Sequence, residues 1–225
     1  HGPGGHASEE ALGIYLPDGF DHAPWGAHVV LEPLNLCAET TDGIANHSWS
    51  RPAPSTPEGE VVAWADRIAY VCHDFEDAVA AGVVEIGDLP PEVTAVAGHR
   101  RSGQITTFVD ALVATMSAQG VVAMPAEQPA ALSAFRRFNY ETIYLRPDSV
   151  RQRDAVIDVL RAVVEHTIAR PQLLPADRVA SDGDVVRAAV RWVADMTDAY
   201  ACRIAVEHLG WPLERLPVGM RAPAL

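Results

Sequence analysis

The chain has 225 residues, of which 48% are hydrophobic and 21% charged, proportions that are typical of a folded globular protein and exclude a disordered one. The formal net charge of −13 argues against broad nucleic-acid binding, since a polyanion is repelled unless basic residues are segregated, and the best basic run is only His99-Arg100-Arg101. No apolar run approaches the roughly 20 residues that span a bilayer, so we expect a cytoplasmic protein without a membrane segment.

Helical periodicity dominates the sequence and strand-like alternation is scarce, which predicts an all-α fold. The expected helices, in chain order, run over about residues 8–15, 24–31, 34–46, 57–81, 103–118, 129–144, 149–169 and 182–209. We expect one domain over residues 1–225, with a soft boundary near residues 170–183, where prolines and an Asp-Gly pair interrupt two long helices.

Two of the connections are predicted from their prolines and glycines. Residues 47–55 hold two prolines beside Trp49 and are expected to form a loop. Residues 82–98, which include Pro90-Pro91, are expected to form a connection with at most one turn of helix.

The start of the first predicted helix carries a histidine and a carboxylate. His6 and Glu9 are three residues apart, so their side chains face the same way. A histidine that is oriented by a carboxylate is a recurrent acid–base unit in enzymes.

The helix over residues 57–81 has the clearest signals. Thr56 offers a hydroxyl cap and Pro57 suits the first helical position. The apolar residues that recur at helical spacing, and are expected to pack into the core, are Val62, Ala65, Ile68, Ala69, Cys72, Phe75 and Val79. Asp66, Tyr70 and Asp74 lie four residues apart on a neighbouring stripe. They either belong to an active site or are ordinary solvated groups on an exposed helix face.

The helix over residues 129–144 repeats functional side chains at the same spacing. Arg136, Tyr140 and Tyr144 are four residues apart and so share one face. Arginine suits phosphate because its planar fork donates two hydrogen bonds at once. The alternative for the two tyrosines is core packing.

Four ordered segments resemble one known family. Asp66-Arg67-Ile68-Ala69-Tyr70, followed by His73-Asp74 and Glu76-Asp77-Ala78, resembles the second signature of the HD-domain deoxynucleoside triphosphate triphosphohydrolases, the dGTPase-like family. The other three are residues 1–12, the run from Leu34-Asn35-Leu36 to His47-Ser48, and Met196-Thr197-Asp198-Ala199-Tyr200-Ala201. The resemblance therefore extends from the first residue to about residue 205.

The resemblance implies an HD fold and a metal-dependent hydrolysis of deoxynucleoside triphosphates to deoxynucleoside and inorganic triphosphate. It implies a divalent metal, for which Mn, Mg, Fe and Ni all fit a mixed histidine and carboxylate site. Asp66 matches the last metal ligand of the family. The other ligands, a His and a His-Asp doublet, would precede His1, so we expect the chain to be the C-terminal portion of a longer protein.

The resemblance also assigns roles to individual residues. His6 and Glu9 would be the catalytic pair, and His22, within Phe20-Asp21-His22, a third acid or phosphate contact. The alternative for His22 is a loop histidine that caps the following helix. The residues expected to bind substrate are His1, Arg67, Tyr70, Asp74, Arg136, Tyr140 and Tyr144. Among them, Arg136 would contact phosphate, Tyr144 would pack on the sugar and Asp74 would accept from its 3′ hydroxyl.

The chain departs from the family at Gly4, where members usually carry Phe, and at Ser8, where they carry Gly. Two other functions stay open: a different HD phosphohydrolase, acting on nucleoside monophosphates, cyclic nucleotides or alarmones, and an inactive nucleotide-binding regulator. Asp198 and Tyr200 are expected to be structural. By analogy with the family, we expect a homo-oligomer.

Overall fold

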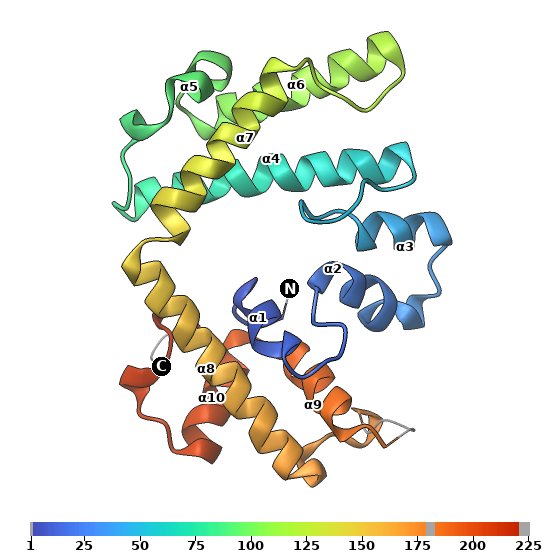
Figure 1. Ribbon diagram of the computed structural model, residues 1–225, viewed down its shortest axis with the longest axis vertical. Helices are drawn as coiled ribbons and strands as arrows, with labels where there is room; N and C mark the ends of the chain where they lie inside the picture. The colour runs from blue at the N-terminus through green and yellow to red at the C-terminus, as the bar shows by residue number, and fades with distance from the viewer. Residues whose placement is uncertain (1, 179–182, 221–225) are drawn as a thin grey trace. The chain divides into compact units, whose positions relative to one another are not determined.

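The computed structural model describes residues 2–178 and 183–220 and confirms the predicted all-α fold (Figure 1). The described residues form ten α-helices and several short 3₁₀ and π segments, and no strand. None of these helices combines the length and the hydropathy that a membrane span requires.

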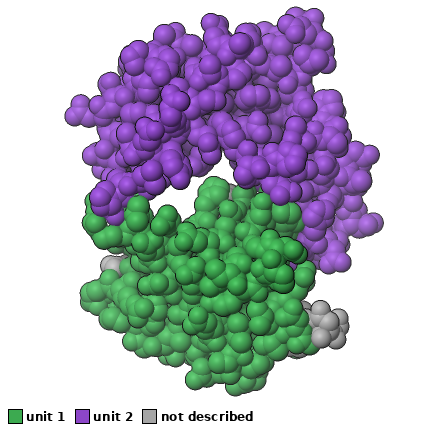
Figure 2. All heavy atoms as spheres, in the orientation of Figure 1, with its two compact units in different colours: residues 1–25, 148–225 green, residues 26–147 purple. Residues whose placement is uncertain are grey.

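The chain divides into two compact units, and each has its own hydrophobic core (Figure 2). Unit 1 combines residues 1–25 with residues 148–225, and unit 2 is the segment between them, residues 26–147. The expectation of a single domain stays a prediction, and the predicted soft boundary near residues 170–183 falls within unit 1.

Unit 1 is built from the two ends of the chain. Its helices are α1 (Ala7–Gly13), α2 (His22–Trp25), α8 (Pro147–Ala169), α9 (Val185–Ala194) and α10 (Asp198–Leu209). Leu12 of α1, Val163 of α8 and Val193 of α9 are fully buried in one core cluster. The short N-terminal helix is therefore covered by the C-terminal third of the chain.

The prediction of one helix over residues 182–209 is wrong, because the described part of this segment holds two helices. Thr197 has an extended backbone and its side chain accepts from the Tyr200 amide at 3.3 Å, which caps α10. Asp184 caps α9 in the same way, through the Arg187 amide at 2.9 Å. The apolar spacing continues across the break, which is why periodicity alone did not reveal it.

Unit 2 is organised around the long helix α4. Its helices are α3 (Ala38–Ala45), α4 (Pro57–Ala80), α5 (Pro91–Ala97), α6 (Arg101–Gln119) and α7 (Glu127–Asn139). In the core, the Phe75 ring of α4 meets the Phe135 ring of α7 edge to face, at 5.4 Å between centroids. At the end of α7 the buried Asn139 amide donates to the Val71 carbonyl of α4 at 2.9 Å, so these two helices are also held by a hydrogen bond.

Helix α4 begins as predicted, but its buried side is partly different. The Thr56 side chain accepts from the Gly59 amide at 3.2 Å, as expected of a cap. Val62, which was expected in the core, is 54% exposed, whereas Ala63 is buried. The side of the first turns that packs into the core is therefore not the predicted one. The reason is close packing of α3, whose Gly43 lies directly against Gly59.

Helix α5 was not predicted, because Pro90-Pro91 was interpreted as a break. Pro91 instead occupies the first helical position, where its missing N–H leaves no hydrogen bond unmade. Val93 and Ala97 of this helix are buried in the unit 2 core. The expectation of at most one helical turn in residues 82–98 is therefore wrong.

Two predicted helices end in π-helical turns. The helix expected over residues 24–31 is α2 followed by the π segment Gly26–Val30, and the helix expected over residues 129–144 is α7 followed by Tyr140–Tyr144. Between Gly26–Val30 and α3, Asn35 has a positive φ of 48°, so α3 starts at Ala38 rather than at residue 34. π turns are frequent at functional sites, and Tyr140–Tyr144 carries two of the predicted site residues.

Candidate functional site

The predicted site residues fall into two groups, one in each unit. Unit 1 holds His6, Glu9 and His22, and unit 2 holds Asp66, Arg67, Tyr70, Asp74, Arg136, Tyr140 and Tyr144. His1 lies outside the described residues.

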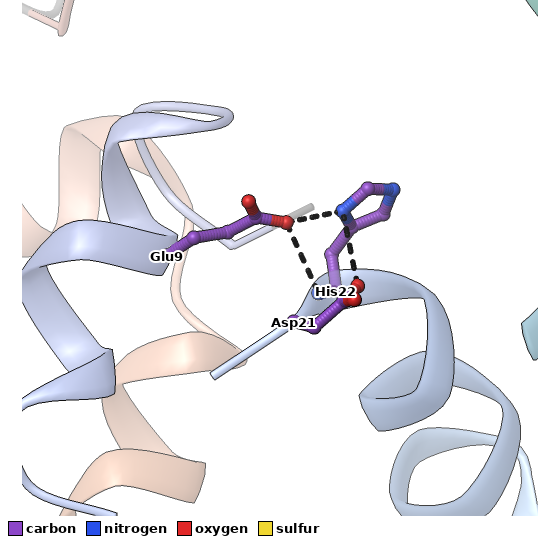
Figure 3. A group of neighbouring side chains, drawn as sticks. All are labelled: Glu9, Asp21 and His22. Carbon is purple, nitrogen blue, oxygen red and sulfur yellow. Dashed lines mark hydrogen bonds and ion pairs between the residues drawn. The ribbon is translucent and has the colours of Figure 1, made fainter. Parts of the chain in front are cut away.

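The centre of the unit 1 group is a contact between Glu9 and His22 (Figure 3). One Glu9 carboxylate oxygen lies 2.5 Å from His22 Nδ1 and also accepts from the His22 amide at 3.2 Å. The His22 side chain is only 9% exposed, so its ring is held with its second nitrogen pointing away from Glu9 (Figure 3). This arrangement fixes both the orientation and the hydrogen-bonding role of the imidazole.

The charge of Glu9 is stabilised by its partners. Burial by itself would raise the pKa of Glu9, but the hydrogen bonds from the His22 ring and amide, with the positive charge of His22 and His6, hold it below its ordinary value. Glu9 is therefore an anion that can stabilise a protonated His22.

His6 and Asp21 complete this group. The His6 ring meets the His22 ring edge-on, at 5.5 Å between centroids. Asp21 Oδ1 lies 3.9 Å from His22 Nδ1 and accepts from the Ala23 amide at 3.0 Å. Sequence reasoning missed Asp21 as a site residue, and its position directly before His22 was the available signal.

The loop before α1 is hydrogen-bonded to the start of α10. The Gly4 amide donates to Asp198 Oδ1 at 2.8 Å. Gly4 has a φ of +75°, and a Cβ at this position would lie 2.2 Å from a Val156 methyl group. The positive φ and this close approach both favour glycine at this position. Ser8 is also structural, since it is buried and its hydroxyl donates to the Gly5 carbonyl at 2.7 Å.

The centre of the unit 2 group is a tyrosine that bonds to a carboxylate. The Tyr144 hydroxyl donates to Asp74 Oδ2. The Tyr144 ring stacks on the Tyr70 ring at 6.0 Å between centroids, and Tyr140 meets it edge-on at 6.2 Å. Tyr140 itself is 52% exposed, so it lies at the margin of this group.

Both inner tyrosines are neutral hydrogen-bond donors at ordinary pH. Burial, followed by the hydrogen bonds with Asp74 and Tyr70, raises the pKa of Tyr144 far above its ordinary value. Burial likewise raises the pKa of Tyr70. The group thus offers aromatic surface, hydroxyl donors and one carboxylate, which suits a sugar with free hydroxyl groups.

Two arginines of unit 2 lie on tryptophan rings. The Arg136 guanidinium carbon is 4.8 Å from the centroid of Trp49, and that of Arg67 is 5.6 Å from the same ring and 5.2 Å from Trp64. Arg67 is half-buried, and its expected contact with a phosphate stays a prediction.

Two places in the described part of the chain offer side chains that could ligate a metal. Asp66 is exposed on α4 and, among the described residues, makes no hydrogen bond and joins no group of three ligating side chains. A free carboxylate of this kind fits one ligand position of a hard divalent cation. Ligating atoms of Glu9, Asp21 and His22 do lie within 4.8 Å of one another, but they already bond to each other and to neighbouring amides. We interpret that second group as an acid–base pair.

Comparison with known families gives one match. The family model described as the phosphohydrolase-associated domain matches residues 122–207, which include α7, α8, α9 and most of α10.

Several individual proteins are similar to this chain. A protein of Caldanaerobacter subterraneus subsp. tengcongensis, named deoxyguanosinetriphosphate triphosphohydrolase-like protein, is 34% identical over 209 residues, 89% of this chain and 61% of the relative. A relative with the same name in Clostridium perfringens strain 13 is 32% identical, over 89% of this chain and 63% of the relative. Another, in Bordetella parapertussis, is 26% identical, over 90% of this chain and 70% of the relative. The chain thus spans about three fifths of the length of the first two relatives.

Proposed function

We propose that this chain, which belongs to the dGTPase-like family of HD-domain phosphohydrolases, forms the larger part of an enzyme that hydrolyses deoxynucleoside triphosphates to deoxynucleoside and inorganic triphosphate. The observation that carries the proposal is the Glu9–His22 pair, in which a carboxylate holds the imidazole at the start of α2 in one orientation, an arrangement that recurs in acid–base catalysis. The substrate class is transferred from the names of the relatives.

In this proposal the unit 1 residues manage protons. Glu9 binds His22 Nδ1 and stabilises the charged ring, so His22 presents its other nitrogen to the reacting groups. His22 then donates a proton to the departing 5′ oxygen of the sugar. His6, in edge contact with that ring, orders the attacking water or a phosphate oxygen.

The unit 2 residues bind substrate. Asp74, already bonded to the Tyr144 hydroxyl, accepts a hydrogen bond from the 3′ hydroxyl of the sugar. Stacked on Tyr70, the Tyr144 ring packs against the 2′ carbon, where an added hydroxyl would be crowded. Arg67 and Arg136 donate to the phosphate groups.

Asp66 would supply one ligand to a divalent metal, with Mn, Mg, Fe and Ni as candidates. Such an ion, when bound, neutralises phosphate charge and lowers the pKa of a bound water. We therefore expect Asp66→Ala to abolish metal-dependent turnover of the full-length protein, while leaving its far-ultraviolet circular dichroism unchanged because the side chain is exposed. Turnover equal to the parent's would contradict the assignment of Asp66.

The activity is tested by chromatography of the full-length protein incubated with each deoxynucleoside triphosphate and Mn or Mg. Deoxynucleoside together with intact inorganic triphosphate is the expected result. Release of monophosphate, or turnover of cyclic nucleotides or alarmones instead, would favour a different HD phosphohydrolase. Saturable nucleotide binding without any product would favour an inactive regulator.

Two further properties belong to the proposal. We place the enzyme in the cytoplasm, where its proposed substrates are made and used. We also propose that it assembles as a homo-oligomer, which sedimentation of the full-length protein tests directly.

A further inference from the structure

Trp49 lies in the loop between α3 and α4, which so far has no part in the proposed function. Its ring is within cation–π distance of two guanidinium groups, Arg136 at 4.8 Å and Arg67 at 5.6 Å. Since Arg67 is also 5.2 Å from Trp64, the four side chains form a row in which aromatic and cationic groups alternate. We call Trp64, Arg67, Trp49 and Arg136 the aromatic–cation row.

The two guanidinium groups of the row have no hydrogen-bonded acceptor in the part of the chain that the structure describes. Within the described residues, neither Arg67 nor Arg136 makes a hydrogen bond or an ion pair with a carboxylate. Two cations that share one ring repel each other, and a bound anion would relieve that repulsion.

Arg67 adds a second sign of an incomplete site. Its Nε is buried and has no hydrogen-bond partner. A buried donor without a partner costs stability, and such a cost is commonly kept where a ligand supplies the missing acceptor.

The loop that carries Trp49 is braced at both ends by Asp42 of α3. One Asp42 oxygen accepts from the Asn46 side chain at 2.9 Å, and the other accepts from the Ser55 amide and hydroxyl at 2.7 and 2.8 Å. Trp49 itself is half-buried against the unit 2 core. Its ring is therefore fixed before any ligand arrives.

We infer that Trp49 is a positioning residue that holds Arg67 and Arg136 ready to bind the phosphate tail of the nucleotide, so that free inorganic triphosphate binds to the same row. This inference rests on the proposed function for the identity of the substrate. A pre-oriented pair of guanidinium groups loses less conformational entropy on binding than two free arginines. Triphosphate fits because it presents several anionic oxygens to two forks at once.

The test is titration calorimetry of the full-length protein, as isolated, with inorganic triphosphate and separately with deoxyguanosine, which has no phosphate. For Trp49→Leu we expect the Kd for triphosphate to rise about tenfold, as two weakened cation–π contacts imply, and the affinity for deoxyguanosine to stay unchanged. Trp49→Phe keeps an aromatic face and should recover part of the loss.

Trp211→Leu is the matched control. Trp211 also has an arginine on its ring, Arg215 at 3.5 Å, but lies in unit 1, whereas the aromatic–cation row lies in unit 2. This variant should bind triphosphate like the parent. Thermal unfolding of all variants shows whether each is folded at the titration temperature.

Three outcomes would overturn the inference: parental triphosphate affinity in Trp49→Leu, an equal loss of triphosphate and deoxyguanosine affinity, or no binding of triphosphate by the parent. Because the titration needs no turnover, its outcome is separate from that of the activity assay. A protein that binds triphosphate through Trp49 but hydrolyses no deoxynucleotide would support the inference and contradict the proposed function.

Discussion

Glu9 and Asp74 are both acids that bond to a ring-bearing side chain, yet their partners give them different chemistry. Glu9 bonds to Nδ1 of an imidazole, a ring that can transfer a proton through its other nitrogen. Asp74 bonds to the hydroxyl of Tyr144, whose pKa is raised far above its ordinary value by burial and by this bond. Glu9 is thus suited to orienting a ring that transfers protons, and Asp74 to holding a hydroxyl group in place.

The low pKa of Glu9 predicts a pH-dependent contribution to stability. A carboxyl whose folded pKa lies below its unfolded value, here 4.5, stabilises the protein above that value and loses this effect as the pH falls through the folded pKa. We expect Glu9→Gln to lower the free energy of unfolding by about 1–3 kcal/mol at pH 7. The gap to the parent should close below about pH 4.

Urea unfolding of parent and variant between pH 3 and 8 measures this gap. Glu10→Gln is the control, because it removes the same charge from the same helix where the side chain is 57% exposed. A gap of constant size down to pH 3 would mean that Glu9 does not carry its charge in the way described.

At the scale of elements, the contact between α3 and α4 decides where the Trp49 loop lies. Gly43 and Gly59 let the two helices approach closely, and Pro54 of the loop packs on Gly59. A Cβ at position 59 would lie 2.6 Å from the Pro54 side chain and 3.2 Å from the Gly43 backbone. No flexible side-chain end is available there to move aside.

We therefore expect Gly59→Ala to destabilise the protein by about 1–3 kcal/mol, although alanine favours a helix over glycine. It should also weaken triphosphate binding, because the loop has to shift. Gly87→Ala is the control, since a Cβ there meets nothing within 4 Å and the expected change is within about 0.5 kcal/mol. Equal stabilities of the two variants by chemical denaturation would rule out the close approach.

At the scale of the molecule, the two ends of the chain are joined in unit 1. The Gly4 amide bonds to Asp198, so the loop that carries His6 depends on the start of α10. Asp198 was expected to be structural, and the bond gives that role a definite partner. This hydrogen bond also joins residues 1–12 to residues 196–201, two of the segments in which the sequence resembles the family.

For Asp198→Ala we expect a loss of about 1 kcal/mol, or roughly 2–4 °C in Tm. Asp198→Asn keeps an oxygen acceptor for the Gly4 amide and should lose less. Differential scanning calorimetry of both variants measures the difference. If asparagine is as harmful as alanine, the contribution of Asp198 lies elsewhere, for example in its charge at the helix start.

Sequence patterns predicted the parts of this molecule that depend on near neighbours. The α4 cap at Thr56 and the extent of α8 follow from local residue preferences. The break before α10 and the start of α5 at Pro91 were missed, because the same residues also suit the opposite interpretation.

The site shows the same limit. Helical spacing predicted that Asp66, Tyr70 and Asp74 share one helix, and all three lie on α4. No local pattern could bring Tyr144 to Asp74 across 70 residues of chain. The sequence did not indicate the inferred role of Trp49 for the same reason, since that role depends on arginines from two other segments.

The assembly of unit 1 from both ends of the chain has a consequence during synthesis. Unit 2 is complete once residue 147 has left the ribosome, whereas Leu12 and Phe20 find their core partners only after α8, α9 and α10 have emerged. At about 5–20 residues per second, the roughly 60 residues from the end of unit 2 to the end of α10 take about 3–12 seconds to emerge. For this time the segment with His6, Glu9 and His22 is tethered to unit 2 while its own hydrophobic residues stay uncovered, so we expect a chaperone to bind it during synthesis.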